Sequence, residues 1–217
     1  FFFKQKTAYE IKECDWSSDV CSSDLNATAV SFDPMKNLNA YGNGGAVVTD
    51  NIDLLEFARE WTNNGKPGHS NIGTNSRMSE IESSQMLVKT QYLDAWQERR
   101  KDIAQYWMTR LKNTPIRSLI DTRNFETHCF HKFVIDVDNR DILQRNLAIK
   151  GIETRVHYKE PLHELPAYKD YEGPGILSVA SSLARRVLSL PCYPELTDLE
   201  VEYVIDSVLD SVLVKHN

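Results

Sequence analysis

The chain has 217 residues, 41% of them apolar, and a formal net charge of -6 at pH 7. This length suits one large or two small domains and can bury a core without a metal or a disulfide. The charge argues against a nucleic-acid partner, which would need a basic surface. No apolar run approaches the roughly 20 residues of a membrane helix, so we expect no membrane span.

The four cysteines, Cys14, Cys21, Cys129 and Cys192, have neither metal-ligand nor C-x-x-C spacing. His128 and His131 lie in the same predicted strand, but no third ligand accompanies them. We therefore expect no metal site and a reducing, cytoplasmic setting.

Residues 1–25 differ in character from the rest of the chain. They begin with three Phe residues and show no helical or strand periodicity. W-S-S-D-V, which ends at Val20, and C-S-S-D-L, which ends at Leu25, form a short repeat, and a signal peptide's basic start and cleavage site are missing. The stretch resembles translated sequencing-adapter sequence. We expect it to be non-native and disordered, with the natural sequence truncated at Asn26; a genuine disordered terminus is the alternative.

The next part of the chain is predicted to hold two strands followed by helices. Its expected elements are a strand over 27–32, a strand over 44–49, a helix capped by Asp50 or Asn51, a polar loop over 63–76, a helix from about Ser79 and a long helix capped by Asp94. Trp61, Trp96 and Trp107 fit apolar stripes and are expected in the core. The loop over 63–76 is long for an ordered connection, which is typical of functional loops.

A linker over 115–126 leads to a second region. Its expected elements are a strand over 128–137, a helix over 139–150, a strand over 152–156, a turn-rich stretch over 161–174, a helix over 178–190 and a final helix that begins at the T-D-L-E capping box over 197–200. Gly151 suits the position that follows a helix. Strand, helix and strand within about thirty residues predict a small α+β unit.

Lys36 follows the first strand, which Asp33 and Pro34 end. A lysine on a loop is usually a solvated charge. Between a buried strand and the G-N-G-G run at 42–45, however, it can be held in a water-poor cleft, where its amine pKa falls and it can form a Schiff base with an aldehyde. From spacing alone, both a phosphate-binding loop and a tight turn before a strand remain open for the glycine run.

Four motifs, in order along the chain, resemble DegT/StrS-type nucleotide-sugar aminotransferases, which are pyridoxal phosphate enzymes. The motifs are S-F-D-P-M-K-N-L-N-A-Y-G-N-G-G-A from Ser31, G-T-N-S-R-M-S-E-I-E-S-S-Q from Gly73, K-G-I-E-T-R-V-H-Y-K-E-P-L-H from Lys150 and R-R-V-L-S-L-P-C-Y-P-E-L-T from Arg185. The resemblance implies an α/β fold: the C-terminal part of a pyridoxal phosphate-dependent transferase. Residues 26–118 would form part of a large domain, with the remnant of a mainly parallel sheet and linking helices, and residues 119–217 a small α+β domain.

By this resemblance, Lys36 forms the Schiff base with pyridoxal 5′-phosphate and moves a proton between the substrate and the cofactor. Ser31 resembles a hydroxyl donor to the cofactor phosphate, although a structural role at the strand end is the alternative. Asn75 matches the family's asparagine that reaches the phosphate of the cofactor in the partner subunit of a homodimer.

Three further residues are substrate candidates by the same resemblance. Arg77 is expected in the substrate cleft, with a structural ion pair to Glu80 or Glu82 as the alternative. Tyr158 and His163 resemble residues near the mouth of the active site, where they would contact the diphosphate or the sugar of the substrate; for His163 a structural role is the alternative.

The implied reaction transfers an amino group, usually from L-glutamate, which leaves as 2-oxoglutarate, to a keto group of a nucleotide-linked deoxysugar. Such products serve as precursors of polysaccharides or glycoconjugates. A related dehydratase branch has His at the lysine position, so Lys36 favours transamination. Complete members are nearly twice as long, and we expect this chain to be a poorly active fragment with exposed apolar surface. The alternatives are a non-catalytic, pyridoxal phosphate-binding regulator and a structural α/β module in which Lys36 is merely solvated.

Overall fold

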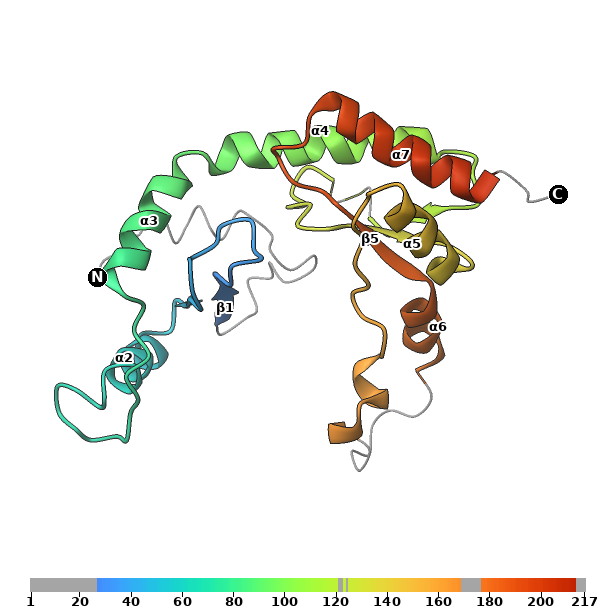
Figure 1. Cartoon of the computed structure of the whole chain (residues 1–217). Helices are drawn as coiled ribbons and strands as arrows, with labels where there is room; N and C mark the ends of the chain where they lie inside the picture. The colour runs from blue at the N-terminus through green and yellow to red at the C-terminus, as the bar shows by residue number, and fades with distance from the viewer. Residues whose placement is uncertain (1–26, 121–122, 124, 169–176, 214–217) are drawn as a thin grey trace. The chain divides into compact units, whose positions relative to one another are not determined.

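The computed structural model describes residues 27–120, 123, 125–168 and 177–213 (Figure 1). The segment 1–25, expected to be non-native, lies outside the described residues. The chain forms two compact units: one comprises the residues up to Gln97 together with Glu126–Cys129, and the other Glu98–Phe125 together with Phe130–Asn217. The expected domain boundary after residue 118 lies inside the second unit, and the boundary between the domains of the whole protein stays a prediction.

The first unit contains a pair of short strands. β1 (Thr28–Ser31) and β2 (Gly45–Val48) pair antiparallel, with Val30 opposite Ala46. The loop that joins them reverses the chain, whereas a parallel pair would need a long crossover. The parallel pairing expected for a larger sheet is therefore not found among the described strands.

Three helices follow the strands: α2 (Ile52–Trp61), α3 (Glu80–Thr90) and α4 (Leu93–Leu111). Asn51 caps α2 by accepting a hydrogen bond from the backbone N–H of Leu54. Ser79 and Glu82 form a capping box at α3. Asp94, expected as the cap of the long helix, lies instead in its first turn, where its charge still favours the helix dipole.

The core of the first unit is small and lies beneath the loop between β1 and β2. Its buried residues are Val30, Phe32, Leu38, Ala40, Met86 and Leu93. α2 contributes no buried residue, and Trp61, expected in the core, is 41% exposed. Trp96 is half-buried, and Ile81 of α3 is 80% exposed. The apolar spacing correctly predicted these helices, but the two-stranded sheet is too small to cover their apolar faces.

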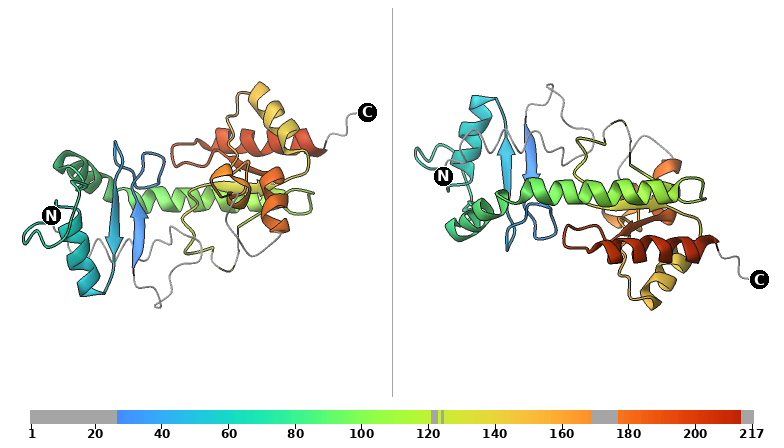
Figure 2. Two further views of the ribbon diagram at one scale, coloured as in Figure 1. Left: turned by 90° about the horizontal axis from the view of Figure 1, so that it is seen from below. Right: turned by 90° about the horizontal axis from the view of Figure 1, so that it is seen from above.

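The second unit contains a three-stranded antiparallel sheet in the order β3-β4-β5. Its strands are β3 (Arg117–Ser118), β4 (Phe133–Asp136) and β5 (Val187–Leu190), and its helices, besides the C-terminal part of α4, are α5 (Arg140–Ile149), α6 (Ser178–Arg186), α7 (Asp198–Leu213) and the short 3-10 turns η2 (Leu162–Glu164) and η3 (Pro166–Tyr168). α7 runs beside the C-terminal part of α4 in every view (Figure 2), and Trp107 donates a hydrogen bond from its indole N–H to the carbonyl of Val201.

Two expected elements of this unit are wrong. The helix predicted over 178–190 ends at Arg186, and Val187–Leu190 is a strand. All four of its residues are buried and pair with β4, and a short apolar run of this kind cannot be told from a buried helix by periodicity. The strand predicted over 152–156 is reduced to one bridge between Arg155 and Ser189, because the N–H of Ile152 closes α5 by bonding to Leu147.

Local signals at helix ends are confirmed. Gly151 follows α5 with a φ of +77°, the left-handed conformation that favours glycine after a helix. Thr197 and Glu200 form the predicted capping box at the start of α7, with the Glu200 carboxylate 2.8 Å from the backbone N of Thr197.

A buried carboxylate at the end of β4 binds two arginines. Asp136 is 2% exposed, and its Oδ1 accepts a hydrogen bond from Nε of Arg186 at 2.6 Å. Its Oδ2 accepts from Nη2 of Arg186 and, at 2.5 Å, from Nη2 of Arg117. Burial by itself raises the pKa of this carboxyl, but the two guanidinium groups outweigh burial and hold the pKa below its ordinary value.

We therefore expect Asp136→Asn to reduce the free energy of unfolding by about 1–3 kcal/mol at neutral pH, since charged hydrogen bonds are lost but both arginines keep access to water. A lowered native pKa gives stability that is present above the ordinary pKa and lost as the pH falls through the native one. In urea denaturation, the difference between the two proteins should thus begin to shrink near pH 4 and disappear only below the lowered native pKa of Asp136. Asp138→Asn is the control: Asp138 is 90% exposed, and we expect less than about 0.5 kcal/mol.

Candidate functional site

The loop that carries Lys36 is held by hydrogen bonds within itself. The Asp33 carboxylate accepts from the backbone N–H of Met35 at 2.9 Å, and the Asp33 carbonyl accepts from that of Lys36 at 2.9 Å. The side-chain amide of Asn39 donates to the carbonyl of Pro34 at 2.7 Å. The backbone at Lys36 is therefore fixed by a tight turn directly after β1.

Residues on both sides of Lys36 anchor this loop in the core. Phe32 before it and Leu38 after it are fully buried. Asn37 is 6% exposed, and its Nδ2 donates to Oε1 of Gln97 and to the carbonyl of Cys129, each at 2.8 Å. Since Nδ2 carries two hydrogens, both bonds can be made at once.

The side chain of Lys36 itself is half-buried. Within the described part of the chain, no acceptor lies within hydrogen-bond distance of its Nζ. The second lysine of this region differs: Nζ of Lys89 donates to the carbonyl and to Oδ1 of Asn39, at 3.0 and 2.5 Å. Burial lowers the pKa of Lys89. Among the described residues, the amine of Lys36 thus has no intramolecular partner, whereas the amine of Lys89 ties α3 to the loop.

Ser31 and the glycine run lie at the same end of the strand pair. The Oγ of Ser31 accepts a hydrogen bond from the backbone N–H of Asp33 at 3.3 Å, which leaves its own proton free to be donated. A Cβ atom at Gly45 would lie 2.8 Å from the carbonyl oxygen of Val30 in the paired strand. Close approach of two backbones therefore accounts for Gly45, in agreement with a turn before a strand.

Asn75 and Arg77 lie on the polar loop between α2 and α3. This loop is ordered: Asn63 and Asn75 form an isolated antiparallel bridge, and the N–H of Thr74 bonds to the carbonyl of Trp61 at 2.7 Å. A Cβ at Gly73 would lie 2.4 Å from the backbone N of Gly65, so the loop folds tightly onto itself. Met78, next to Arg77, packs against the core of the first unit.

The side chains of Asn75 and Arg77 are exposed. Among the described residues neither makes a side-chain hydrogen bond or ion pair, and the alternative ion pair of Arg77 with Glu80 or Glu82 is not formed. Glu82 is used instead in the capping box of α3. Both side chains are thus available to a ligand.

Tyr158 and His163 lie in the second unit, on the segment between α5 and α6. Tyr158 is 75% exposed, and its ring is nearly perpendicular to that of His157 at a centroid distance of 5.6 Å. The side chain of His163 is 31% exposed, and its Nε2 lies 3.2 Å from Oγ of Ser181. The six predicted site residues therefore form three groups: Ser31 with Lys36, Asn75 with Arg77, and Tyr158 with His163.

Sequence reasoning missed three polar residues of this segment. The Nδ1 of His157 lies 2.9 Å from Oγ of Ser189 in β5. Burial, followed by the charges of Lys132 and Arg155, lowers the pKa of His157. Ser181 and Glu164, which contact each other beside His163, were also missed. His157 lies within the motif that begins at Lys150, and Glu164 directly follows that motif. The motif was the only feature of the sequence that pointed to either residue.

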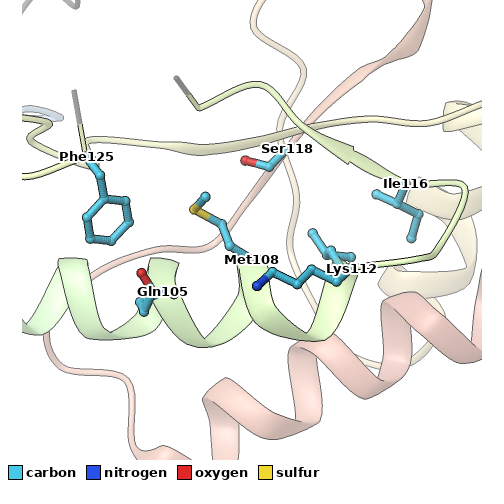
Figure 3. Close-up of a pocket in the computed structure, with 7 residues that line it drawn as sticks. Gln105, Met108, Lys112, Ile116, Ser118 and Phe125 are labelled. Carbon is cyan, nitrogen blue, oxygen red and sulfur yellow. The ribbon is translucent and has the colours of Figure 1, made fainter. Parts of the chain in front are cut away.

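A separate pocket of about 500 Å³ lies between α4 and β3 (Figure 3). Its wall is mainly apolar and is formed by Met108, Leu111, Ile116 and Phe125, with Lys112 beside Met108. None of the predicted site residues lines it. We find no link between this pocket and the chemistry of Lys36.

The described part of the chain contains no group of three or more His, Cys, Asp or Glu residues that could hold a metal ion. Within the same residues, no helix is long and apolar enough to cross a membrane. Cys129 and Cys192 are both buried, Cys192 is not in a disulfide, and Cys14 and Cys21 lie outside the described residues. Burial raises the pKa of the Cys192 thiol to about 11, although Arg100 opposes this, so Cys192 is a poor nucleophile at neutral pH.

The order and spacing of these residues match a known family of proteins. The model of the DegT/DnrJ/EryC1/StrS aminotransferase family matches residues 14–209. The chain belongs to this family. The match starts within the segment 1–25 that we expected to be non-native, and it includes all six predicted site residues.

Individual members of the family are similar along most of the chain. The chain is 44% identical over 184 residues to the "Erythromycin biosynthesis sensory transduction protein EryC1" of Saccharopolyspora erythraea, covering 83% of this chain and 50% of that protein. It is 38% identical over 187 residues to the "dTDP-3-amino-3,4,6-trideoxy-alpha-D-glucose transaminase" of Streptomyces venezuelae, covering 84% of this chain and 49% of that protein. The chain thus spans about half the length of these relatives.

A solved structure of the family shares the fold. The crystal structure of S. venezuelae DesV in complex with a ketimine intermediate superposes with a TM-score of 0.80 at 35% identity, covering 88% of this chain and 52% of that one. The expected fold class, part of a pyridoxal phosphate-dependent transferase fold with mixed helices and sheets, is therefore confirmed.

Proposed function

We propose that this protein is a pyridoxal phosphate-dependent aminotransferase that moves an amino group from L-glutamate to a keto group of a nucleotide-linked deoxysugar. Family membership and the 38% identity to a transaminase named for a dTDP-sugar support the reaction class and the substrate class. The observation that carries the proposal is Lys36, an amine that has no intramolecular partner in the described part of the chain and that lies on a loop fixed in the core. The thiol of Cys192, which is buried and not in a disulfide, favours a reducing compartment, the cytoplasm.

The residues near Lys36 fit the cofactor by the chemistry of their donors. A primary amine without a partner can bond covalently to an aldehyde. The Ser31 hydroxyl retains a proton for a phosphate oxygen, and the exposed amide of Asn75 is a second neutral donor. The buried neighbours Phe32 and Leu38 fix the backbone that carries the amine. We assign Lys36, Ser31 and Asn75 to cofactor binding, with Asn75 serving the cofactor of the partner subunit.

Pyridoxal phosphate, when bound, supplies an electron sink for the carbon from which a proton is removed. The task of Lys36 is to hold the cofactor through Nζ and then, as a free amine, to take up and return that proton. Ser31 would hold the phosphate of the cofactor bound at Lys36, and Asn75 would hold the phosphate of the cofactor in the partner subunit. The nucleotide sugar is assigned to Arg77, whose guanidinium suits phosphate oxygens, and to Tyr158 and His163.

A homodimer is part of this proposal. α2 and α3 expose large apolar side chains for which the described part of the first unit has no cover, including Phe57, which is 46% exposed, and Val88, which is 56% exposed. Exposed apolar surface of this kind is typical of interfaces. A second subunit would also receive Asn75 near its own cofactor.

The test is the first half of the reaction. The 217-residue chain, and any longer form that the same gene encodes, is incubated with pyridoxal phosphate and then with L-glutamate. Conversion of the cofactor to its amine form, followed by absorbance, and release of 2-oxoglutarate are expected, with D-glutamate as the control. If every form binds the cofactor at Lys36 but none releases 2-oxoglutarate, the enzymatic proposal is wrong.

A second candidate is a regulator that binds pyridoxal phosphate without catalysis. It is favoured by one observation, the name of the relative that is 44% identical, which describes a sensory transduction protein. The half-reaction separates the two candidates, because a regulator would retain the Lys36-bound cofactor in the presence of L-glutamate.

A further inference from the structure

His163, Ser181 and Glu164 form a hydrogen-bonded group between η2 and α6; α6 is labelled in Figure 1. The Nε2 of His163 lies 3.2 Å from Oγ of Ser181 and 3.5 Å from Oε1 of Glu164. The Ser181 hydroxyl donates to the same Oε1 of Glu164. Ser181 is half-buried, while the side chains of His163 and Glu164 are 31% and 49% exposed. Two adjacent residues of η2 therefore converge on one hydroxyl of α6.

The directions of these hydrogen bonds follow from the number of protons. A serine hydroxyl has one proton and two lone pairs, and an ionised carboxylate can only accept. Because Ser181 gives its proton to Glu164, it can only accept from His163. The Nε2 of His163 must then carry a hydrogen, and this N–H also points toward the negative charge of Glu164, 3.5 Å away. In a neutral imidazole, the other nitrogen, Nδ1, is consequently an acceptor.

The Nδ1 atom of His163 is available to a ligand. In the part of the chain that the structure describes, all contacts of the His163 ring are made through Nε2. The partial exposure of this side chain gives Nδ1 access to solvent. An acceptor nitrogen pairs with a hydroxyl group, whereas a diphosphate oxygen, which is itself an acceptor, would need a donor.

We propose that Ser181 and Glu164 are positioning residues that keep the proton of the neutral form of His163 on Nε2, so that Nδ1 accepts a hydrogen bond from a hydroxyl of the substrate's sugar. The tautomer follows from the described contacts alone. The ligand assignment rests on the proposed function, and it selects the sugar over the diphosphate as the group that His163 contacts.

The tautomer is tested on the 217-residue chain by long-range nitrogen–proton NMR of ¹⁵N-labelled histidine at about pH 8, where an ordinary imidazole is neutral. This spectrum separates a ring nitrogen that carries hydrogen from one that does not. The His163 signals are assigned from their loss in His163→Gln. We expect a protonated Nε2 and an unprotonated Nδ1; a protonated Nδ1 would overturn the proposal.

Variants of the two positioning residues move the proton in predictable ways. Glu164→Ala frees the Ser181 hydroxyl to donate to Nε2, so we expect the population with hydrogen on Nδ1 to increase. Ser181→Ala should return the ring to the tautomer mixture of free imidazole, and Ser181→Thr, which keeps the hydroxyl, should restore the native spectrum. Ser182→Ala, the neighbouring serine of α6, is the matched control and should change nothing. If Glu164→Ala and Ser181→Ala both leave the His163 signals unchanged, neither residue positions the ring.

The ligand assignment is tested with dTDP-glucose and dTDP as probes. We expect dTDP-glucose to shift the Nδ1 signal of His163 and dTDP, which lacks the sugar, to leave it unchanged. An equal shift with dTDP, or no shift with dTDP-glucose, would overturn the contact with the sugar hydroxyl. Neither result would alter the outcome at Lys36, which tests the proposed function separately.

Discussion

Replacing Lys36 by alanine is expected to abolish covalent binding of pyridoxal phosphate and to reduce the rate of the glutamate half-reaction by about 10³-fold or more. A positioned proton-transfer group alone contributes roughly 10²–10⁴-fold, and the same amine also holds the cofactor. The measurement is borohydride reduction of the loaded protein, which makes the bond between amine and cofactor permanent, followed by peptide mapping. Lys36→Arg, which keeps the charge but cannot form this bond, should be equally inactive.

Two other lysines provide the controls for this experiment. Lys89 is the rival, since it contacts the same loop and burial lowers its pKa, but its Nζ is engaged by Asn39. Lys112, an exposed lysine beside the pocket of the second unit, reports non-specific labelling. A reduced adduct that maps to Lys89 in the native protein, or that persists in Lys36→Ala, would show that the assignment is wrong.

Replacing Trp107 by alanine is expected to reduce the free energy of unfolding by about 3–5 kcal/mol, as for other fully buried aromatic residues. Trp107 is completely buried, its ring meets that of Phe133 edge to face at a centroid distance of 5.1 Å, and its Nε1 donates to the Val201 carbonyl at 2.9 Å. The substitution leaves a cavity between α4 and β4 and removes the hydrogen bond to α7. Because a domain is stable by only about 5–15 kcal/mol, the loss should be visible at once in urea denaturation.

The same change at an exposed tryptophan separates this effect from the loss of any indole. Trp61 is 41% exposed, so Trp61→Ala should cost less than about 1 kcal/mol. Trp107→Phe keeps much of the ring but lacks the N–H donor. An intermediate loss of unfolding free energy in this variant would separate the contribution of packing from that of the hydrogen bond. Equal losses for Trp107→Ala and Trp61→Ala would contradict the central position of Trp107 in the core.

Features that depend on neighbouring residues could be predicted from the sequence. Asn51 caps α2, a helix begins after Ser79, the capping box at Thr197 starts α7, and Gly151 follows α5. Each of these signals acts over three or four residues, so its chemistry is contained in a short stretch of sequence. The placement of Lys36 on a loop directly after a strand has the same origin, since Pro34 ends the strand.

Features that depend on distant residues could not be predicted. Val187–Leu190 is a strand because β4 lies beside it, and nothing in its own four residues distinguishes it from the end of a helix. Whether a tryptophan is buried depends on whether other elements pack against it. Trp107 is therefore in the core, and Trp61 is not. Helical spacing describes which side chains share a face, but not whether another element covers that face.

In the candidate site, too, some features depend on neighbouring residues and others on distant ones. Sequence motifs identified the candidate site residues, among them Lys36, Ser31, Asn75, Tyr158 and His163. Their partners came from the fold: Ser181 is 18 residues from His163 along the chain, and only the packing of α6 brings it close. A motif can therefore name a ligand-binding histidine, while the contacts that determine its tautomer have to be seen in three dimensions.

The position of Asn37 has a consequence for the order in which the site is made during synthesis. This residue lies beside Lys36, yet one of its two acceptors, the carbonyl of Cys129, is 92 residues further along the chain. Because proteins are made from the N-terminus at about 5–20 residues per second, Lys36 leaves the ribosome several seconds before its loop can be secured. The amine is thus synthesised before the residue that secures its loop, and it reaches its final surroundings only after Cys129 has been made.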